Sequence, residues 1–135
     1  MNQWANRLVW SLSVMLVLAA GTEAFWNGNV QVRIYNSLEY TKDLTIHCKS
    51  KDDDLGARVL SSGEHFEFQF APHMFKKTLF FCSMAWDGQS HWFDIYEEDR
   101  DGDCNSSRCT WDVKQNGPCT VATGTLLFVC HPWNK

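Results

Sequence analysis

Apolar and polar residues alternate along most of this sequence. The stretch HFEFQF at 65–70 is the clearest example, because its three phenylalanines fall on one side of an extended chain and its polar residues on the other. VQVRIY at 30–35 and LTIHC at 44–48 show the same period of two. Alternation over four to eight residues that are rich in aromatic and β-branched types is typical of half-buried β-strands. The chain is therefore expected to be built from strands, since no stretch has helical periodicity over three turns.

Further strands are predicted towards the C-terminus, and residues that favour turns separate them. The predicted strands lie at 78–86, 91–97, 108–113, 120–121 and 125–130. The turn signals lie at 36–37, 54–56, 62–63, 87–88 and 116–118. About seven or eight short strands at this spacing predict an all-β fold, namely an antiparallel β-sandwich. A closed β-barrel is the alternative.

The hydrophobic core is expected where the inward-facing residues of these strands meet. Stretch 78–86 is apolar on both faces, which is typical of a central strand. The residues expected to form the core are Phe66, Phe68, Phe70, Phe80, Cys82, Ile95 and Trp111.

The N-terminus has the composition of a secretory signal peptide. A short polar stretch that contains Arg7 precedes an apolar run from Leu8 to Ala20, and small residues follow it. The run is shorter than the roughly 20 apolar residues that span a membrane. We predict cleavage after Ala24, with a signal anchor as the alternative, so that residues 25–135 form one secreted domain.

All six cysteines lie in the predicted mature domain. An even number in a short secreted domain is typical of a disulfide framework, here of three bridges. Spacing alone does not choose among the fifteen possible pairings of six cysteines. A zinc site is the competing use of cysteine, but the sequence has no C-x-x-C pair. The cysteines expected to form disulfides are Cys48, Cys82, Cys104, Cys109, Cys119 and Cys130.

Charge and hydropathy limit the classes of partner. The formal net charge is −4 and no basic stripe is present, which argues against nucleic acid. The apolar run at 126–129 is too short for a lipid-anchor signal. We expect a released monomer that needs no cofactor and does not insert into a membrane.

Two acidic clusters are candidates for chemistry. In HCKSKDDDLG, at 47–56, three aspartates are consecutive, so their side chains do not converge on one ion as in an EF-hand loop. We interpret this cluster as a turn in which Gly56 adopts a positive φ, with a weak calcium site or a partner contact as alternatives. In EEDRDGDC, at 97–104, Cys104 stands where the calcium loop needs glycine and Thr110 where it needs glutamate. A solvated loop is the interpretation here.

The sequence offers little for catalysis. Its five histidines do not fall into a recognisable catalytic motif, and TIHC at 45–48 matches a secreted-ribonuclease motif over three residues only. A secreted hydrolase or other defence enzyme remains the alternative function. Asn105, in Asn105-Ser106-Ser107, is a candidate N-glycosylation site.

Several of these segments together carry a family resemblance. HCKSKDDDLG, GEHFEFQF, TLFFCSMAW, HWFDIY, RCTWDV and NGPC occur in the order and spacing of the plant self-incompatibility S-protein homologues. The sequence resembles this family over about residues 30 to 120. It departs from the pattern at Phe68, where many members have tryptophan, and at Cys104 and Cys130, which are additional cysteines.

The resemblance implies a small secreted β-sandwich that acts as a protein ligand for a cell-surface receptor or other membrane protein, with pollen rejection as the known role of the family. It also implies nested disulfides, with Cys104–Cys130 as the additional pair. The implied nested pairs are Cys48–Cys119 and Cys82–Cys109.

The segment 97–108 is the expected recognition loop, because it is the longest polar segment, is densely charged and lies beside two cysteines. A wall-associated structural protein without a receptor is a further alternative. The residues expected to contact the partner are Glu97, Glu98, Asp99, Arg100, Asp101 and Asp103.

Overall fold

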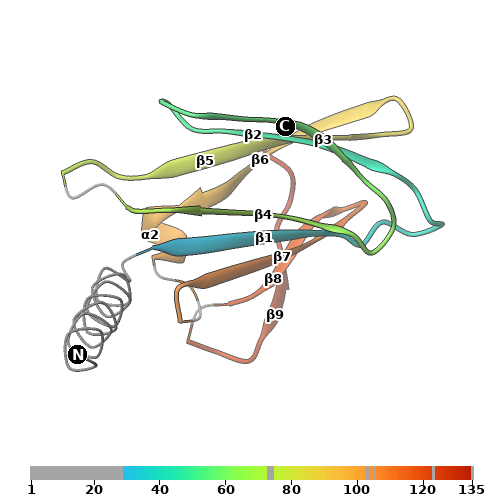
Figure 1. The fold of residues 1–135 in the computed structure, drawn as a ribbon. Coiled ribbons are helices and arrows are strands. Elements are labelled where there is room, and N and C mark those ends of the chain that lie inside the picture. Colours follow the sequence, from blue (N-terminus) through green and yellow to red (C-terminus); the bar gives the residue numbers. More distant parts are fainter. Residues whose placement is uncertain (1–28, 73–74, 103, 105, 123, 135) are drawn as a thin grey trace, which may run out of the picture.

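The computed structural model describes residues 29–72, 75–102, 104, 106–122 and 124–134. Within these residues, two β-sheets pack face to face, so the predicted β-sandwich is confirmed (Figure 1). The predicted signal peptide lies outside the described residues. No helix among those described has the length and apolar character to cross a bilayer.

Nine strands form the two sheets of the described chain. The first sheet contains, in spatial order, β4 (His65–Phe70), β1 (Val30–Asn36), β7 (Arg108–Lys114), β8 (Gly117–Val121) and β9 (Phe128–Cys130). The second contains β3 (Asp54–Leu60), β2 (Leu44–Lys49), β5 (Leu79–Trp86) and β6 (Gln89–Glu97). Neighbouring strands are antiparallel except for β1 and β7, which pair in parallel.

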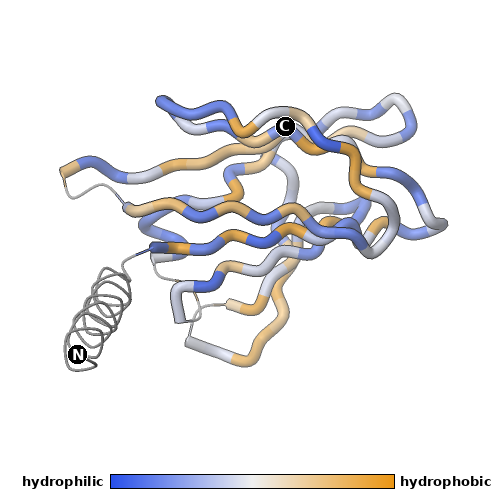
Figure 2. The backbone as a smooth tube through the Cα atoms, in the orientation of Figure 1, coloured by the Kyte–Doolittle hydropathy of each residue, from blue (hydrophilic) through white to orange (hydrophobic). Residues whose placement is uncertain are grey.

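The core lies between the sheets and follows from the alternation in the sequence. Apolar and polar positions alternate along β1 and β4 in Figure 2, so each strand turns its apolar side inward. Of the seven predicted core residues, five are buried. Phe68 and Phe70 are only half-buried, and their rings contact the ring of Phe80 at centroid distances of 4.9 and 4.7 Å. They line the rim of the core because they lie on β4, at the edge of its sheet.

The turn predicted at 54–56 is wrong in position. The chain reverses earlier, where the Ser50 N–H donates to the Asp53 carbonyl at 2.8 Å and the Asp53 N–H donates to the Ser50 hydroxyl at 3.0 Å. Asp54 is already the first residue of β3, a strand that sequence reasoning missed. Gly56 does have the expected positive φ, +80°, but it adopts it inside this strand, at the β-bulge between Asp54 and Ala57 in the β2–β3 ladder.

All six cysteines form disulfides, but the nested pairings Cys48–Cys119 and Cys82–Cys109 and the additional pair Cys104–Cys130 are wrong. Two of the actual bridges join residues that lie directly opposite each other in neighbouring antiparallel strands, β2 with β5 and β8 with β9. The third closes a short loop before β7. The observed bridges are Cys48–Cys82, Cys119–Cys130 and Cys104–Cys109, with Cα–Cα distances of 4.0, 3.9 and 5.2 Å.

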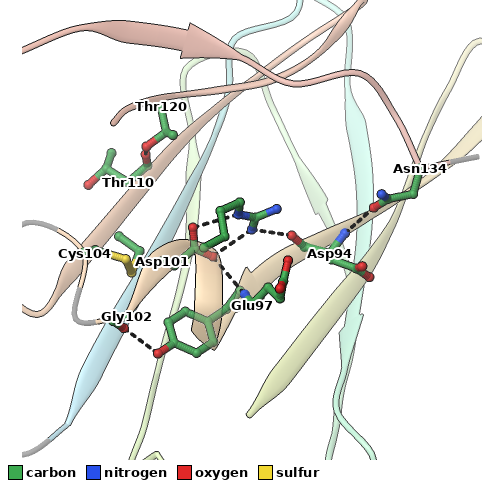
Figure 3. Close-up of polar contacts among 11 residues, drawn as sticks. Asp94, Glu97, Asp101, Gly102, Cys104, Thr110, Thr120 and Asn134 are labelled. Atoms are coloured by element: carbon green, nitrogen blue, oxygen red, sulfur yellow. Dashed lines mark hydrogen bonds and ion pairs between the residues drawn. A yellow bond between two sulfur atoms is a disulfide. The ribbon is translucent and has the colours of Figure 1, made fainter. Parts of the chain in front are cut away.

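The C-terminal segment, residues 131–134, ties the two sheets together at one end. The Asn134 N–H donates to the Trp92 carbonyl at 2.8 Å, and the Asp94 N–H donates to the Asn134 side-chain oxygen at 2.6 Å (Figure 3). Both acceptor and donor belong to β6, the edge strand of the second sheet. Because this segment follows β9 of the first sheet directly, it bridges the sandwich.

Gly117 allows the C-terminal segment to lie against the start of β8. Its φ is +143°, and a Cβ atom at this position would lie 1.9 Å from the His131 carbonyl oxygen. The His131 N–H donates to the Pro118 carbonyl at 2.9 Å. Only glycine combines this backbone conformation with such a close approach.

Candidate functional site

The predicted recognition segment, 97–108, has three parts. It begins at the last residue of β6, continues as one helical turn, α2 (Glu98–Asp101), and ends in a loop that the Cys104–Cys109 disulfide closes. The Gly102 N–H donates to the Glu98 carbonyl at 2.9 Å and ends the turn. Asp103 and Asn105 lie outside the described residues, so the partner contact and the glycan predicted there stay predictions.

Asp101 lies at the centre of this segment and is buried. Only 7% of the residue is exposed, and its carboxylate accepts hydrogen bonds from the Arg100 Nε and Nη2 at 2.8 and 2.7 Å and from the Glu97 backbone N–H at 2.9 Å (Figure 3). A carboxylate at this depth requires such partners, because burial removes its hydration. The prediction of a solvated loop is therefore wrong for this residue.

Arg100 packs inward with Asp101. Its guanidinium lies 5.0 Å from the ring centroids of both Phe93 and Trp111, within the range of cation–π attraction, and its Nη2 donates to the Asp94 carbonyl at 2.6 Å. Two of the six residues predicted to contact a partner, Arg100 and Asp101, thus form a structural ion pair that anchors α2 to the core.

The other acidic residues of the segment differ in their exposure. Glu98 accepts a hydrogen bond from the Thr78 backbone N–H at 3.0 Å and so links α2 to the start of β5. Asp99 points outward and pairs with Lys77 at 2.5 Å, and this hydrogen bond raises the pKa of Lys77 above its ordinary value. Among the described acidic residues of the segment, only Asp99 is exposed.

The loop after α2 has an unusual backbone. Cys104, Ser106 and Ser107 have positive φ angles of 51°, 56° and 64°, which non-glycine residues seldom adopt. The Cys104–Cys109 disulfide spans all three. The Tyr96 hydroxyl donates to the Gly102 carbonyl at 2.5 Å and fixes the entrance of the loop (Figure 3). The loop is held in one shape by covalent and hydrogen bonds rather than by intrinsic preference.

The acidic cluster at 52–54 is arranged differently. Asp54 binds His47 at 2.5 Å, and this hydrogen bond, followed by one from the Gly56 N–H, lowers the pKa of Asp54 below its ordinary value. Asp52 and Asp53 are exposed. Within the described part of the chain, no three or more histidine, cysteine, aspartate or glutamate side chains gather as metal ligands would.

Comparison with known proteins now identifies the family. Residues 31–133 match the profile of the family described as plant self-incompatibility protein S1. The chain belongs to the S1 family.

Several S1-family relatives come from Arabidopsis thaliana. S-protein homolog 2 is 50% identical over 109 residues, which cover 77% of this chain and 68% of the relative. S-protein homolog 5 is 42% identical over 114 residues and 84% of each chain, and S-protein homolog 19 is 37% identical over 131 residues, which cover 93% of this chain and 96% of the relative. No solved structure matches the chain.

Sequence reasoning did not predict that His131 of this S1-family chain lies near the site. Its ring lies 5.6 Å from that of Trp111 and 5.9 Å from that of Phe93, beside Arg100. Burial lowers the pKa of His131, and the positive charge of Arg100 lowers it further. The sequence carried no signal for this cluster, because His131 and Arg100 come together only through the fold.

Proposed function

We propose that this protein is a secreted, non-enzymatic recognition protein that binds a cell-surface partner through the segment 97–108. Membership of the S1 family supports a recognition role. The proposal places the contact on α2 and on the loop that the Cys104–Cys109 disulfide closes.

The observation that carries this proposal is the fixed shape of the segment. The disulfide and the hydrogen bonds of Glu98 and Asp101 hold the backbone before any partner arrives, even where its φ angles are positive. A segment that is already ordered loses less conformational entropy on binding. Polar loops on a rigid β-scaffold are also where binding residues are commonly found.

The residues of the segment divide into a support and a contact surface. Arg100, Asp101 and Glu98 hold the shape from within. Asp99 is exposed and Glu97 is half-buried, so these two offer acidic groups to a basic partner surface. Asp103 is proposed as a further acidic contact, as the sequence predicted.

Secretion is part of the same proposal. The signal peptide is expected to be removed after Ala24, and a glycan on Asn105 would lie in the disulfide-closed loop. Mass spectrometry of the protein collected outside expressing plant cells should find Phe25 as the first residue. Protein that stays inside the cells with residues 1–24 attached would contradict this part of the proposal.

Charge reversal at one exposed residue tests the contact surface. Asp99→Lys should slow association with plasma-membrane preparations and weaken the salt dependence of that rate, because exposed charges at an interface act mainly on the on-rate. Asp53→Lys is the matched control, since Asp53 is also an exposed aspartate and belongs to the other acidic cluster. Surface plasmon resonance measures both rates, and circular dichroism checks both folds.

The proposal predicts different association rates for the two variants. Slower association of Asp99→Lys, with Asp53→Lys unchanged, supports recognition by 97–108. Equal rates for the wild type and Asp99→Lys, or a loss confined to Asp53→Lys, would show that the contact surface lies elsewhere.

A further inference from the structure

The described chain has four sheet edges, and one of them differs from the others. The edge strands are β4 and β9 in the first sheet and β3 and β6 in the second (Figure 1). An edge strand presents backbone groups to which another strand can add, and proteins usually block it with charged side chains, a bulge or a covering segment. Three of the four edges have such a block.

The blocked edges are those of β6, β3 and β4. The C-terminal segment covers β6 through the two hydrogen bonds of Asn134. β3 contains a β-bulge and carries Asp54 and Arg58. β4 carries His65 and Glu67. Addition of another strand to these edges would displace the covering segment or place charged side chains against the new strand.

β9 has no comparable block. Residues 122–132 contain no aspartate, glutamate, lysine or arginine, and no described strand pairs with the edge of β9 that points away from β8. Apolar side chains are instead exposed beside and within β9: 99% of Leu126, 68% of Leu127 and 53% of Phe128. Figure 2 shows hydrophobic colour where the chain enters β9. Neighbouring exposed apolar side chains of this kind indicate an interaction surface.

The hydrogen bonds of the β8–β9 hairpin show which backbone groups of β9 are free. The His131 N–H donates to β8, and the Leu127 carbonyl accepts from the residue that follows β8, both at 2.9 Å. Hydrogen-bonded and non-hydrogen-bonded pairs alternate in an antiparallel ladder, so the groups of Val129 also point to β8. The N–H and C=O of Phe128 and Cys130 therefore point away from β8, where another strand could bond them.

We propose that β9 pairs with the β9 strand of a second copy of this chain, antiparallel across a two-fold axis at Val129. This axis places Phe128 of each copy opposite Cys130 of the other, so that the free N–H and C=O groups of both copies can bond each other. The two first sheets then continue into one another. The contact also removes part of the exposed apolar surface of both hairpins from water.

The lack of charge on β9 favours a second copy as the occupant. In a two-fold contact each strand meets an identical strand, and like charges that face each other across a strand pair are destabilising. β3, β4 and β6 all carry acidic residues, whereas the three residues of β9 are uncharged. Because β9 is short, we expect a reversible dimer.

This dimer differs from the monomer that the sequence predicted, because the sequence did not show which strand ends the sheet. The inference does not depend on the proposed partner contact of 97–108. If both hold, one dimer presents two copies of that segment to a cell surface, which strengthens binding wherever both can engage.

Amide hydrogen exchange across a dilution series tests the strand pairing. NMR of the ¹⁵N-labelled protein with its disulfides formed should show slower exchange at Phe128 and Cys130 as concentration rises, because their N–H groups then bond the second copy. Exchange at Val129, whose N–H points to β8, should not change. Sedimentation velocity on the same samples should show a monomer–dimer equilibrium. A dimer that leaves Phe128 and Cys130 unprotected, or no dimer at all, would overturn the proposal.

Charged side chains at Phe128 provide the deciding variants. Phe128→Lys and Phe128→Glu each bring two like charges together across the axis, because diagonal neighbours in paired strands lie within reach of long side chains. Each variant alone should weaken the dimer about tenfold or more. An equimolar mixture of the two should restore dimerisation, since opposite charges then meet.

Val59→Lys is the matched control, because Val59 is an exposed apolar residue on β3, an edge strand of the other sheet. It should dimerise as the wild type does, and circular dichroism checks the fold of all three variants. Unchanged dimerisation of both Phe128 variants, an equal loss in Val59→Lys, or a mixture that stays monomeric would each contradict pairing through β9.

Discussion

The two acidic segments of the molecule look alike in sequence and differ in structure. In the segment 52–54, the first two carboxylates face solvent, and Asp54 is fixed by a surface contact with His47. In the segment 97–103, Asp101 is buried, and the neighbouring Arg100 covers two aromatic rings of the core.

The difference comes from the arginine and from what surrounds it. Arg100 can neutralise Asp101 with two parallel hydrogen bonds while its flat face packs on Phe93 and Trp111. The lysine beside the other cluster, Lys49, reaches Asp54 only at 3.9 Å and forms no such pair. Density of acidic residues therefore does not indicate whether a segment is solvated.

The largest difference in stability between the two segments is expected when one aspartate is removed from each. Asp101→Ala leaves the Arg100 guanidinium without its ion-pair partner, and we expect a loss of about 3 kcal/mol in the free energy of unfolding. Asp53→Ala removes an exposed carboxylate and should change stability by no more than about 0.5 kcal/mol. Urea denaturation of the two variants measures both values.

A double variant separates the lost charge from lost packing. Arg100→Met with Asp101→Leu removes both charges and keeps apolar volume, so it should recover part of the stability that Asp101→Ala loses. Recovery stays incomplete because the Glu97 N–H and the Asp94 carbonyl lose their partners. Equal stability of Asp101→Ala and Asp53→Ala would show that the two segments do not differ as described.

The hydrogen bond between α2 and the start of β5 should have a smaller effect. Glu98→Ala leaves the Thr78 N–H without this acceptor, and we expect a loss of about 1–2 kcal/mol, since the acceptor is charged. Asp53→Ala, in the exposed segment, is the comparison. Thermal unfolding followed by circular dichroism should show a lower midpoint for Glu98→Ala alone.

Two groups, His131 beside Arg100 and Asp54 in the first segment, should lower stability in different pH ranges. The pKa of His131 is lowered from 6.5, so the unfolded chain takes up its proton first and stability falls as the pH drops below about 6.5. The pKa of Asp54 is lowered from 3.8, so its contribution is present above about 3.8 and is lost as the pH falls through the lowered value.

His131→Phe distinguishes the two ranges. This variant keeps a ring against Trp111 and removes the titration, so the loss of stability that begins below about pH 6.5 should diminish while the loss below about pH 3.8 remains. Unfolding midpoints measured from pH 3 to 8 give both curves. If His131→Phe loses as much stability near pH 6 as the wild type does, another group causes that loss.

The smallest effect is expected at the surface pair of the first segment. Asp54→Asn weakens the contact with His47 but keeps a side-chain oxygen for the Gly56 N–H, so global stability should hardly change. Because the amide oxygen of asparagine is a weaker acceptor than a carboxylate, amide hydrogen exchange should be somewhat faster at Gly56 and unchanged at Gly102. Faster exchange throughout β3 would mean that this pair holds the strand as well as the turn.

The fold could be predicted because the period of two is a local property. The prediction for 65–70 coincides with β4, and those for 30–35 and 44–48 differ from β1 and β2 by one residue. β3 was missed because Asp54 and Gly56 are turn-forming residues, and here they occur inside a strand beside a bulge.

The details of the site could not be predicted because they depend on neighbours in space. Cys48 bonds Cys82 because β2 lies beside β5, an adjacency that spacing does not encode. Asp101 is buried because β6 and β7 bring Phe93 and Trp111 beneath Arg100. Sequence identified the segment, whereas the sheet order decided which of its residues face inward.

The parallel pairing of β1 with β7 also sets the order in which the chain can fold. Gln31 lies opposite Arg108, so the first strand acquires this neighbour only after most of the chain has been synthesised. Pairings between residues distant in sequence require closure of a long loop and form slowly. The strands of the β5–β6 hairpin are joined by the tight turn at Asp87 and Gly88, so they can pair as soon as both have been synthesised. During synthesis the second sheet can therefore form early, while β1 keeps one side unpaired until β7 emerges from the ribosome.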